Sequence, residues 1–313
     1  MQTPDISVVI MAHNRREFLT NAIDSVINQT LDDDKYEIIV ILNFQDPGLL
    51  QFSPRVRFIY HTDLTIGEVI SLGVRESSGE IISFLDDDDI FLPGKLQKVR
   101  EVFNKNPKLA YFHNNYLRFT SFPISDLEKG LFFSTNSLFL PLGKQNLRNV
   151  RKFLKYGGNF NMSCISIRKG FFPSDFKRKY NYLQDTIVFY LLLQKGDYLL
   201  DDGILTHYFS HNSISNQDIN IIVEKSVVAL SEVIGYAKGS TNTLVSSDLA
   251  VNRVMSEILA ETGSKMDCGI AILKLIRRLW VLNFQTRLMI AILGVASLFN
   301  HDFARKLLMK IKY

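Results

Sequence analysis

The stretch Ile81–Asp89 constrains this chain more than any other, because a short apolar run ends there in four consecutive carboxylates. The run Ile81–Leu85 is bounded by polar residues and predicts a buried strand. In open α/β sheets, ligands bind beyond the carboxyl ends of the strands, which is where these acids would lie. Adjacent like charges repel one another, so the cluster favours a bound cation, and carboxylate oxygens suit Mg²⁺ or Mn²⁺. The alternative is a solvated acidic turn.

The first half of the chain alternates strand and helix patterns. Apolar strand runs are expected at 6–11, 36–42, 56–60, 81–85 and 109–112, with helices at 18–27, at 66–76 and after Pro93. Asn14 followed by Glu17 resembles the start of a helix with a side-chain cap. Further strand patterns occupy 162–167 and 198–209, on either side of a helix pattern at 182–195. Strands that alternate with helices in this way predict an α/β fold with a mostly parallel mixed sheet.

Between these regular regions, the stretch 117–157 has a weak pattern broken by proline and glycine, and we expect an irregular insertion that serves as a lid or acceptor-binding region. From residue 217 to 313 the chain looks helical, so we expect a catalytic-sized domain at 1–216 and a helical C-terminal region. The two cysteines, Cys164 and Cys268, indicate neither a disulfide framework nor a zinc site. With no signal-peptide pattern at the N-terminus, they favour a cytoplasmic setting.

The C-terminal region is basic: eight lysines and arginines and one acid follow Gly269, whereas the whole chain carries a net charge of +4. Residues 270–283 place leucines and isoleucines on one helical face and Lys274, Arg277 and Arg278 on the other, as in a helix that lies on a membrane surface. The apolar run Leu288–Phe299 is too short to span a bilayer alone. The alternatives are an ordinary packed helix or a dimer interface. Nucleic acid is not expected, because no motif for it accompanies the charge.

Several motifs occur in an order that resembles the inverting family 2 glycosyltransferases, which have the GT-A fold. Ser7–Arg15 resembles their first strand and nucleotide-binding turn, and Ser25–Thr30 the end of their first helix. Ser78–Asp88 is similar to their central strand and DxD motif, and Pro93 and Lys95 follow at the family's spacing.

Further on, Gln184-Asp185 stands where the family has a Glu-Asp pair, and His207–Ser215 resembles the segment that closes the catalytic domain. The resemblance covers about residues 5–215. It departs from the family after the second strand, where an acidic pair is replaced by Asn43, with Asp46 three residues later.

The resemblance implies a metal-dependent, inverting transferase that uses a nucleoside-diphosphate sugar. It implies Asp88 as the direct ligand of Mn²⁺ or Mg²⁺, Asp86 as a contact to the ribose or a metal-bound water, and Asp185 as the base. Asp185 could instead only complement a helix dipole, and Arg15 could be a solvated charge. The remaining expected contacts are Ala12, His13, Asn14, Arg15, Asn43, Asp63 and Asp87 for the nucleotide sugar and His211 for the metal.

We expect UDP as the nucleotide, because the family uses it most often, and a hydroxyl of a glycan or lipid-linked saccharide as the acceptor. The expected location is the cytoplasmic face of a membrane, as a peripheral protein. One alternative is a polyprenyl-phosphate sugar synthase of the same fold, and another is a non-catalytic membrane-associated scaffold. The sequence leaves open whether the chain forms a homo-oligomer.

Overall fold

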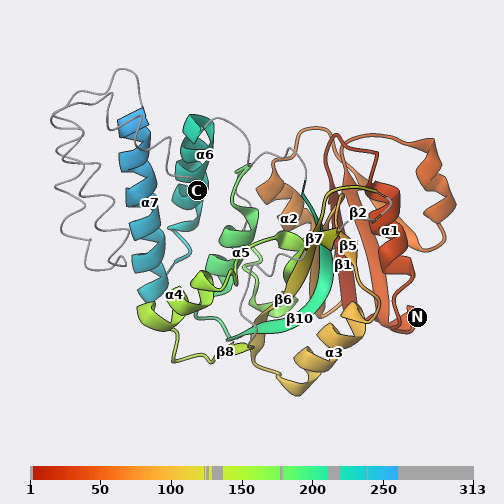
Figure 1. Ribbon diagram of the computed structural model, residues 1–313, viewed down its shortest axis with the longest axis horizontal. Helices are drawn as coiled ribbons and strands as arrows, with labels where there is room; N and C mark the ends of the chain where they lie inside the picture. The colour runs from red at the N-terminus through yellow and green to blue at the C-terminus, as the bar shows by residue number, and fades with distance from the viewer. Residues whose placement is uncertain are drawn as a thin grey trace. The chain divides into compact units, whose positions relative to one another are not determined.

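The computed structural model describes residues 3–122, 124, 127–128, 137–176, 179–210, 219–237 and 239–259. The chain divides into two compact units, one of Met1–Lys179 with Gln184–His211 and the other of Tyr180–Leu183 with Asn212–Tyr313. In the second unit, the helices α6 (Ile219–Val233) and α7 (Gly239–Leu259) pack against each other (Figure 1). The predicted membrane-surface helix at 270–283 lies outside the described residues.

The first unit is built on one mixed sheet, with the strand order β3-β2-β1-β4-β9-β6-β10-β5 and two short strands, β7 and β8, paired to β6 and β10 (Figure 1). Strands β1 to β4 are mutually parallel, β9 is antiparallel to both of its neighbours, and β6 and β10 are parallel to each other. The strands are β1 Ile6–Ala12, β2 Tyr36–Leu42, β3 Val56–Tyr60, β4 Ile81–Asp86, β5 Ile90–Phe91, β6 Leu109–Phe119, β7 Leu127–Glu128, β8 Leu138–Leu140, β9 Ile165–Arg168 and β10 Asp197–Phe209. The predicted α/β fold is confirmed.

Side chains of a strand alternate between the two faces of the sheet, and because all residues of β1 are buried, helices cover both faces. The even positions of β1, such as Val8 and Ile10, join a core with the apolar sides of α1 and α3. The odd position Val9 faces α2, which lies so close that a Cβ on Gly73 would come within 2.6 Å of Val9 Cγ1. The helices of this unit are α1 Leu19–Ile27, α2 Ile66–Glu76, α3 Lys95–Lys105, α4 Leu147–Lys155 and α5 Gln184–Leu192.

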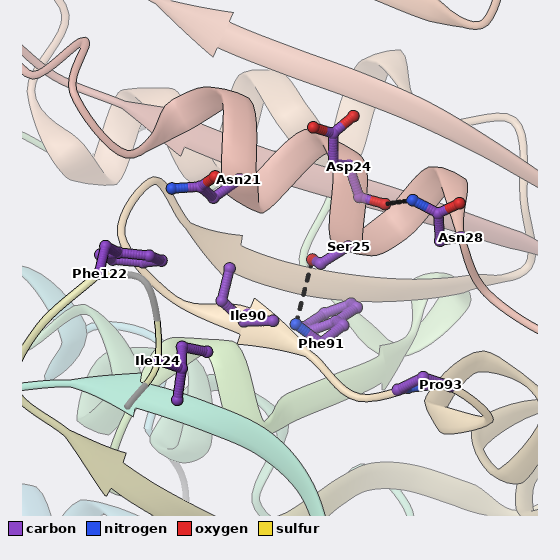
Figure 2. A pocket seen from close by; sticks show the side chains of 9 residues that line it. All are labelled: Asn21, Asp24, Ser25, Asn28, Ile90, Phe91, Pro93, Phe122 and Ile124. Atoms are coloured by element: carbon purple, nitrogen blue, oxygen red, sulfur yellow. Dashed lines mark hydrogen bonds between the residues drawn. The ribbon is translucent and has the colours of Figure 1, made fainter. Parts of the chain in front are cut away.

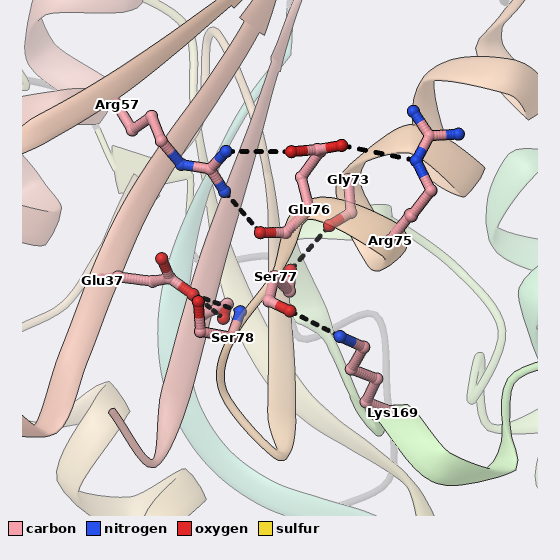
Figure 3. Close-up of polar contacts among 9 residues, drawn as sticks. Glu37, Arg57, Gly73, Arg75, Glu76, Ser77, Ser78 and Lys169 are labelled. Atoms are coloured by element: carbon pink, nitrogen blue, oxygen red, sulfur yellow. Dashed lines mark hydrogen bonds and ion pairs between the residues drawn. The ribbon is translucent and has the colours of Figure 1, made fainter. Parts of the chain in front are cut away.

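The turn that enters β4 is fixed at the edge of the sheet opposite the acids (Figure 3). Glu37 of β2 accepts hydrogen bonds from the Ser7 hydroxyl, at 2.6 Å, and from the Ser78 backbone N–H, at 2.5 Å. A Cβ on Gly79 would lie 2.7 Å from the backbone of Ile6, so only glycine lets the chain pass there. The Ser78-Gly79 motif is therefore explained by packing, and it sets the register of β4 against β1.

Two local expectations were wrong. Helix α1 begins at Leu19, after Phe18, and has no side-chain cap, so Asn14 does not cap it. Residues Met162–Cys164 form a 3₁₀ turn rather than a strand, and β9 starts only at Ile165. The stretch 117–157, expected to be irregular, contains β8 and α4 in its described part. Among the described helices, none is both long and apolar enough to cross a membrane.

Candidate active site

The loops that follow β1, β2 and β4 meet at one edge of the sheet. These strands are parallel and in register, with Met11 beside Asp86 and Ala12 beside Leu42. The carboxyl ends of the strands therefore bring three groups of predicted residues together. They are Ala12 at the end of β1 with His13, Asn14 and Arg15 after it, Asn43 after β2, and Asp86 at the end of β4 with Asp87, Asp88 and Asp89 after it.

Arg15 bridges two of these acids. Its guanidinium Nη1 lies 2.6 Å from Asp88 Oδ2, and its Nη2 forms an ion pair with Asp87. The His13 backbone N–H donates a further hydrogen bond to Asp87 Oδ2 at 3.3 Å. Because the side chains of Asp87 and Asp88 are only 2% and 9% exposed, these contacts replace much of their lost hydration. Arg15 is thus part of the acid cluster and not a solvated charge.

The acid cluster holds more negative charge than its surroundings balance. Burial raises the pKa of Asp87 to about 7, against the opposing effect of Arg15. Burial and the Asp88 carboxylate raise the pKa of Asp89 to about 7 as well. Burial and the three following acids raise the pKa of Asp86 well above its usual range. Arg15 forms ion pairs with only two of these four carboxylates, so the cluster favours additional positive charge.

Asp89 is hydrogen-bonded to β10 and to the loop before β9. Its Oδ1 accepts a hydrogen bond from the Phe209 backbone N–H at 2.8 Å, and its Oδ2 accepts one from Asn161 Nδ2 at 3.2 Å. The Phe209 ring packs at centroid distances of 4.7 Å from Phe18 and 5.0 Å from Phe119. Asp89 therefore connects the end of β4 to β10 and to the loop before β9.

Asp185 is held in the first turn of α5 by the same loop. Its Oδ2 accepts a hydrogen bond from the Asn161 backbone N–H at 3.1 Å, and its Oδ1 accepts one from the Thr186 N–H at 2.7 Å. Burial raises its pKa above the ordinary value, although these hydrogen bonds oppose the shift. Asn161 thus contacts two separate carboxylates, Asp89 and Asp185, and places them on either side of one residue.

Asn161 has a backbone conformation that few residues adopt, with φ 66° and ψ 113°. Its side-chain oxygen accepts a hydrogen bond from the Ser163 N–H at 2.8 Å, which supports this geometry. Sequence reasoning missed this residue. The available signal was weak: an asparagine, which tolerates positive φ, follows the Gly157-Gly158 turn.

Asn14 and Asn43 form a reciprocal pair between the first two loops. The Asn14 N–H donates to Asn43 Oδ1 at 2.9 Å, and Asn43 Nδ2 donates to Asn14 Oδ1 at 2.8 Å. Asn14 has φ 59°, which explains why it joins this loop instead of capping α1. Asp63 is exposed in the loop after β3, which β2 and β1 separate from β4. His211 lies outside the described residues.

Comparisons with known proteins assign the sequence that forms this site to one family. The family model described as "Glycosyl transferase family 2" matches residues 7–171, more than half of the chain. The chain belongs to glycosyltransferase family 2. An uncharacterized glycosyltransferase of Nostoc sp. is 30% identical over 119 residues, which cover 35% of this chain and 36% of that protein. One from Haemophilus influenzae is 27% identical over 169 residues, which cover 49% and 55% of the two chains.

Solved structures support the GT-A fold of this family 2 chain. The crystal structure of Staphylococcus aureus TarS residues 1–349 covers 98% of this chain and 92% of its own, with a TM-score of 0.64 and 12% identity. The same protein has been solved with UDP-GlcNAc, at a TM-score of 0.63 and 13% identity. At this identity the likeness to TarS shows the fold alone. The matches to the two curated relatives described above span between a third and about half of the length of those proteins.

The donor chemistry of this family 2 site fits a hard divalent cation. Within the described ranges, no three histidine, cysteine, aspartate or glutamate side chains form a group that could hold a metal by themselves. Magnesium, however, is commonly bound through one or two carboxylates, with substrate phosphates completing the coordination. The acid cluster, with its excess negative charge, suits that arrangement.

The family motif Ser25–Thr30 has a structural role. The Ser25 hydroxyl accepts a hydrogen bond from the Phe91 N–H at 3.1 Å, and Gln29 Oε1 accepts one from the Leu96 N–H at 3.0 Å. These contacts fix the segment that leaves the acids. A hollow of about 350 Å³ lies beside α1 and β5, between Ser25, Phe91 and Phe122 (Figure 2). Neither Asp185 nor any of the four acids that follow Leu85 lines it, so we assign it no role in the chemistry.

Proposed function

We propose that this family 2 chain is a metal-dependent, inverting glycosyltransferase that moves a sugar from a nucleoside-diphosphate sugar to an acceptor hydroxyl. One observation carries the proposal: Asn161 is hydrogen-bonded both to Asp89 of the negatively charged acid cluster and to Asp185, which opens α5. Transfer of a sugar requires a stabilised leaving diphosphate on one side of the anomeric carbon and a base on the other. The acid cluster supplies ligands for a cation that stabilises the diphosphate, and Asp185 supplies the base.

The donor is proposed to bind along the β1 and β2 loops. Asn14 and Asn43 present amide groups there, and His13 and Arg15 connect this loop to the acids. UDP is the favoured nucleotide, a choice supported by the complexes of TarS with UDP and with UDP-GlcNAc. Ala12 is buried at the end of β1 and would limit how deeply the nucleotide enters.

The proposed cation is Mn²⁺ or Mg²⁺, held by Asp88 with Asp86 next to it. When bound, such an ion stabilises the negative charge of the leaving diphosphate as a Lewis acid. Arg15 is hydrogen-bonded to Asp88 and Asp87 and orients both carboxylates. His211 remains a proposed metal contact on the basis of the family resemblance alone.

Asp185 is the proposed base. A raised pKa makes a carboxylate a stronger base, and two backbone N–H groups fix its orientation. Asp185 takes the proton of the acceptor hydroxyl. The oxygen of that hydroxyl bonds to the anomeric carbon as the bond between this carbon and the diphosphate breaks. Attack from the side opposite the leaving group inverts the configuration at that carbon.

The proposed acceptor is a hydroxyl of a glycan or a lipid-linked saccharide. A polyprenyl-phosphate sugar synthase of the same fold is the second candidate, and its phosphate acceptor needs no base. The hydrogen bonds that orient Asp185 favour the hydroxyl acceptor. The basic residues of 270–283 support a peripheral location at the cytoplasmic face of a membrane.

The first test is nucleoside-diphosphate release from a panel of UDP-, GDP- and dTDP-sugars in the presence of Mn²⁺. We expect release from one donor by the wild type and none by Asp88→Ala. Asp34→Asn is the matched control, because Asp34 is exposed and precedes β2 at the opposite edge of the sheet. Equal release by the wild type and Asp88→Ala would contradict the proposed metal site. No release together with no metal-dependent binding of any nucleotide would favour the scaffold.

A further inference from the structure

One aromatic side chain beside the proposed base is left open to solvent. Phe160 is 38% exposed, although both of its neighbours are tied to the first turn of α5. Asn159 Nδ2 donates to Thr186 Oγ1 at 2.8 Å, and the Asn161 N–H donates to Asp185 Oδ2 at 3.1 Å. The Phe160 carbonyl is also paired with His113 Nε2 at 2.6 Å. The ring therefore projects from a fixed backbone and not from a loosely held loop.

The Phe160 ring belongs to a group of three rings. Its centroid lies 5.7 Å from that of Tyr208, in an edge-to-face arrangement, and 5.7 Å from that of Tyr116. Tyr116 and Tyr208 lie 5.5 Å apart. Tyr116 is 1% exposed and Tyr208 is half-buried, so Phe160 is the member that faces outward most. Edge-to-face contacts of this kind hold a ring in one orientation.

This group of rings extends from Asp185 toward the acid cluster. Tyr208 directly precedes Phe209, whose N–H binds Asp89. Burial and the charges of Asp89 and Asp88 raise the pKa of Tyr208 to about 12, which agrees with their proximity. The rings come from β6, β10 and the loop before β9, on the opposite side of β4 from β1 and β2. They therefore lie away from the loops proposed for the nucleotide.

A rigid aromatic face next to a carboxylate base suits one class of ligand. A pyranose ring has a face of C–H groups, which packs on the electron-rich face of an aromatic ring, and a rim of hydroxyls, which need polar partners. We propose that Phe160 is the platform on which the acceptor's saccharide ring stacks, with a hydroxyl of that ring directed to Asp185. The proposal rests on the transferase function and adds that the acceptor is recognised as a sugar ring.

Saccharide binding can be measured by saturation-transfer NMR with methyl β-glucopyranoside, methyl β-galactopyranoside and methyl N-acetyl-β-glucosaminide, in the presence of UDP and the diamagnetic ion Mg²⁺. We expect the wild type to give ring-proton signals with at least one of them. Phe160→Ala should weaken binding about three- to tenfold, whereas Phe160→Tyr should restore it. Tyr60→Ala is the control, because Tyr60 is a 51% exposed aromatic residue on β3, which β2 and β1 separate from β4, and it should bind as the wild type does.

In the transfer assay, Phe160→Ala should raise the acceptor KM by more than the donor KM. Equal binding by Phe160→Ala and the wild type would overturn the proposal, as would a larger change in the donor KM, which would place the ring on the nucleotide side. A wild type that hydrolyses the donor but binds none of the three glycosides would also overturn it. A wild type that binds a glycoside at Phe160 but no nucleotide would instead contradict the transferase function.

Discussion

The backbone N–H of Asn161 binds Asp185 while the side chain of the same residue binds Asp89, at 3.1 Å and 3.2 Å. The two acids are far apart in sequence and belong to different elements, since Asp89 follows β4 and Asp185 opens α5. A single residue with a positive φ thus sets their separation. Uncommon backbone conformations of this kind persist where the surrounding contacts maintain them, and they are frequent at functional sites.

We first predict that Asn161→Gly lowers kcat about tenfold and moves the acidic limb of the pH–rate profile to higher pH. Glycine retains the φ of 66° but removes the hydrogen bond to Asp89 and the one from Ser163. Loss of the Ser163 contact loosens the loop and weakens the hydrogen bond from the Asn161 N–H to Asp185. Because that bond stabilises the charged form of Asp185, its weakening raises the pKa of this carboxyl. The measurement is kcat/KM from pH 5 to 9, and an unchanged profile with lowered activity would indicate a purely structural role.

The second prediction concerns Asp185→Asn, which should lower kcat by about 10²–10⁴ while the donor KM changes little. Asparagine retains the size of the side chain but cannot take a proton. Because burial raises the pKa of Asp185, the base is present above that raised pKa, and the wild-type rate should fall as pH falls through it. The variant should lack this limb. Asp202→Asn, an exposed substitution on β10, is the control. Transfer by Asp185→Asn at the wild-type rate would favour a phosphate acceptor.

A third prediction is that Arg15→Ala makes the protein depend on divalent cations for stability. Removing the guanidinium leaves the buried Asp87 and Asp88 without their partner, and we expect a loss of about 1–3 kcal/mol of unfolding free energy, below the range for fully buried pairs because Arg15 is 40% exposed. Mn²⁺ should then stabilise the variant more than the wild type in urea denaturation. Equal stabilisation of the two proteins would argue against cation binding at this cluster.

Fourth, the buried Lys95 should give stability a measurable pH dependence. Its Nζ donates to Thr206 Oγ1 at 3.0 Å and to the Ser163 carbonyl, and burial lowers its pKa to about 7. The unfolded chain binds this proton up to about pH 10.5, so between pH 7 and 10.5 it binds more protons than the folded chain, and folded-state stability rises with pH. Below pH 7 the full penalty for burying the charge applies.

Replacing Lys95 with methionine should remove this slope, which can reach about 1.4 kcal/mol per pH unit. The measurement is the difference in unfolding free energy between the wild type and Lys95→Met at pH 7, 8, 9 and 10. A difference that is constant across these four values would show that Lys95 keeps its proton in the folded protein.

The fifth prediction tests the basic stretch 270–283, which rests on sequence alone. Replacement of Lys274, Arg277 and Arg278 with glutamine should reduce sedimentation with vesicles rich in anionic lipid and leave sedimentation with neutral vesicles unchanged. Replacement of Lys98, Lys105 and Lys108 of the first unit is the matched control. Equal sedimentation of both variants with anionic vesicles would show that this stretch does not bind the membrane.

The residues around β1 and β4 could be placed from the sequence because their positions follow from local patterns. Once two apolar runs are parallel neighbours in one sheet, the residues after them must share an edge, and Arg15 meets Asp88 there. The role of Asn161 could not be predicted in this way. It depends on a loop, on a positive φ and on two partners far along the chain, none of which has a periodic signature.

The predicted cap at Asn14 was wrong for a related reason. A capping pattern describes what a side chain can do within one turn of helix, whereas the Asn14 side chain is engaged by Asn43 from a neighbouring strand. The contact between these two loops depends on the pairing of β1 with β2, so it cannot be predicted from the residues next to Asn14 in the sequence.

Strand β9 runs antiparallel to β4 and β6, and this direction has a consequence for how the protein can diversify. Strand β6 ends and β9 begins at the edge that carries the acids, and between them β7 pairs with β6 and β8 pairs with β10. The segment between Phe119 and Asn161 is therefore a cassette with fixed ends on one edge. Exchange of this segment would have to preserve β8, which pairs with β10, and the buried Phe153 of α4, so new acceptor preferences are most readily grafted by recombination around those two elements.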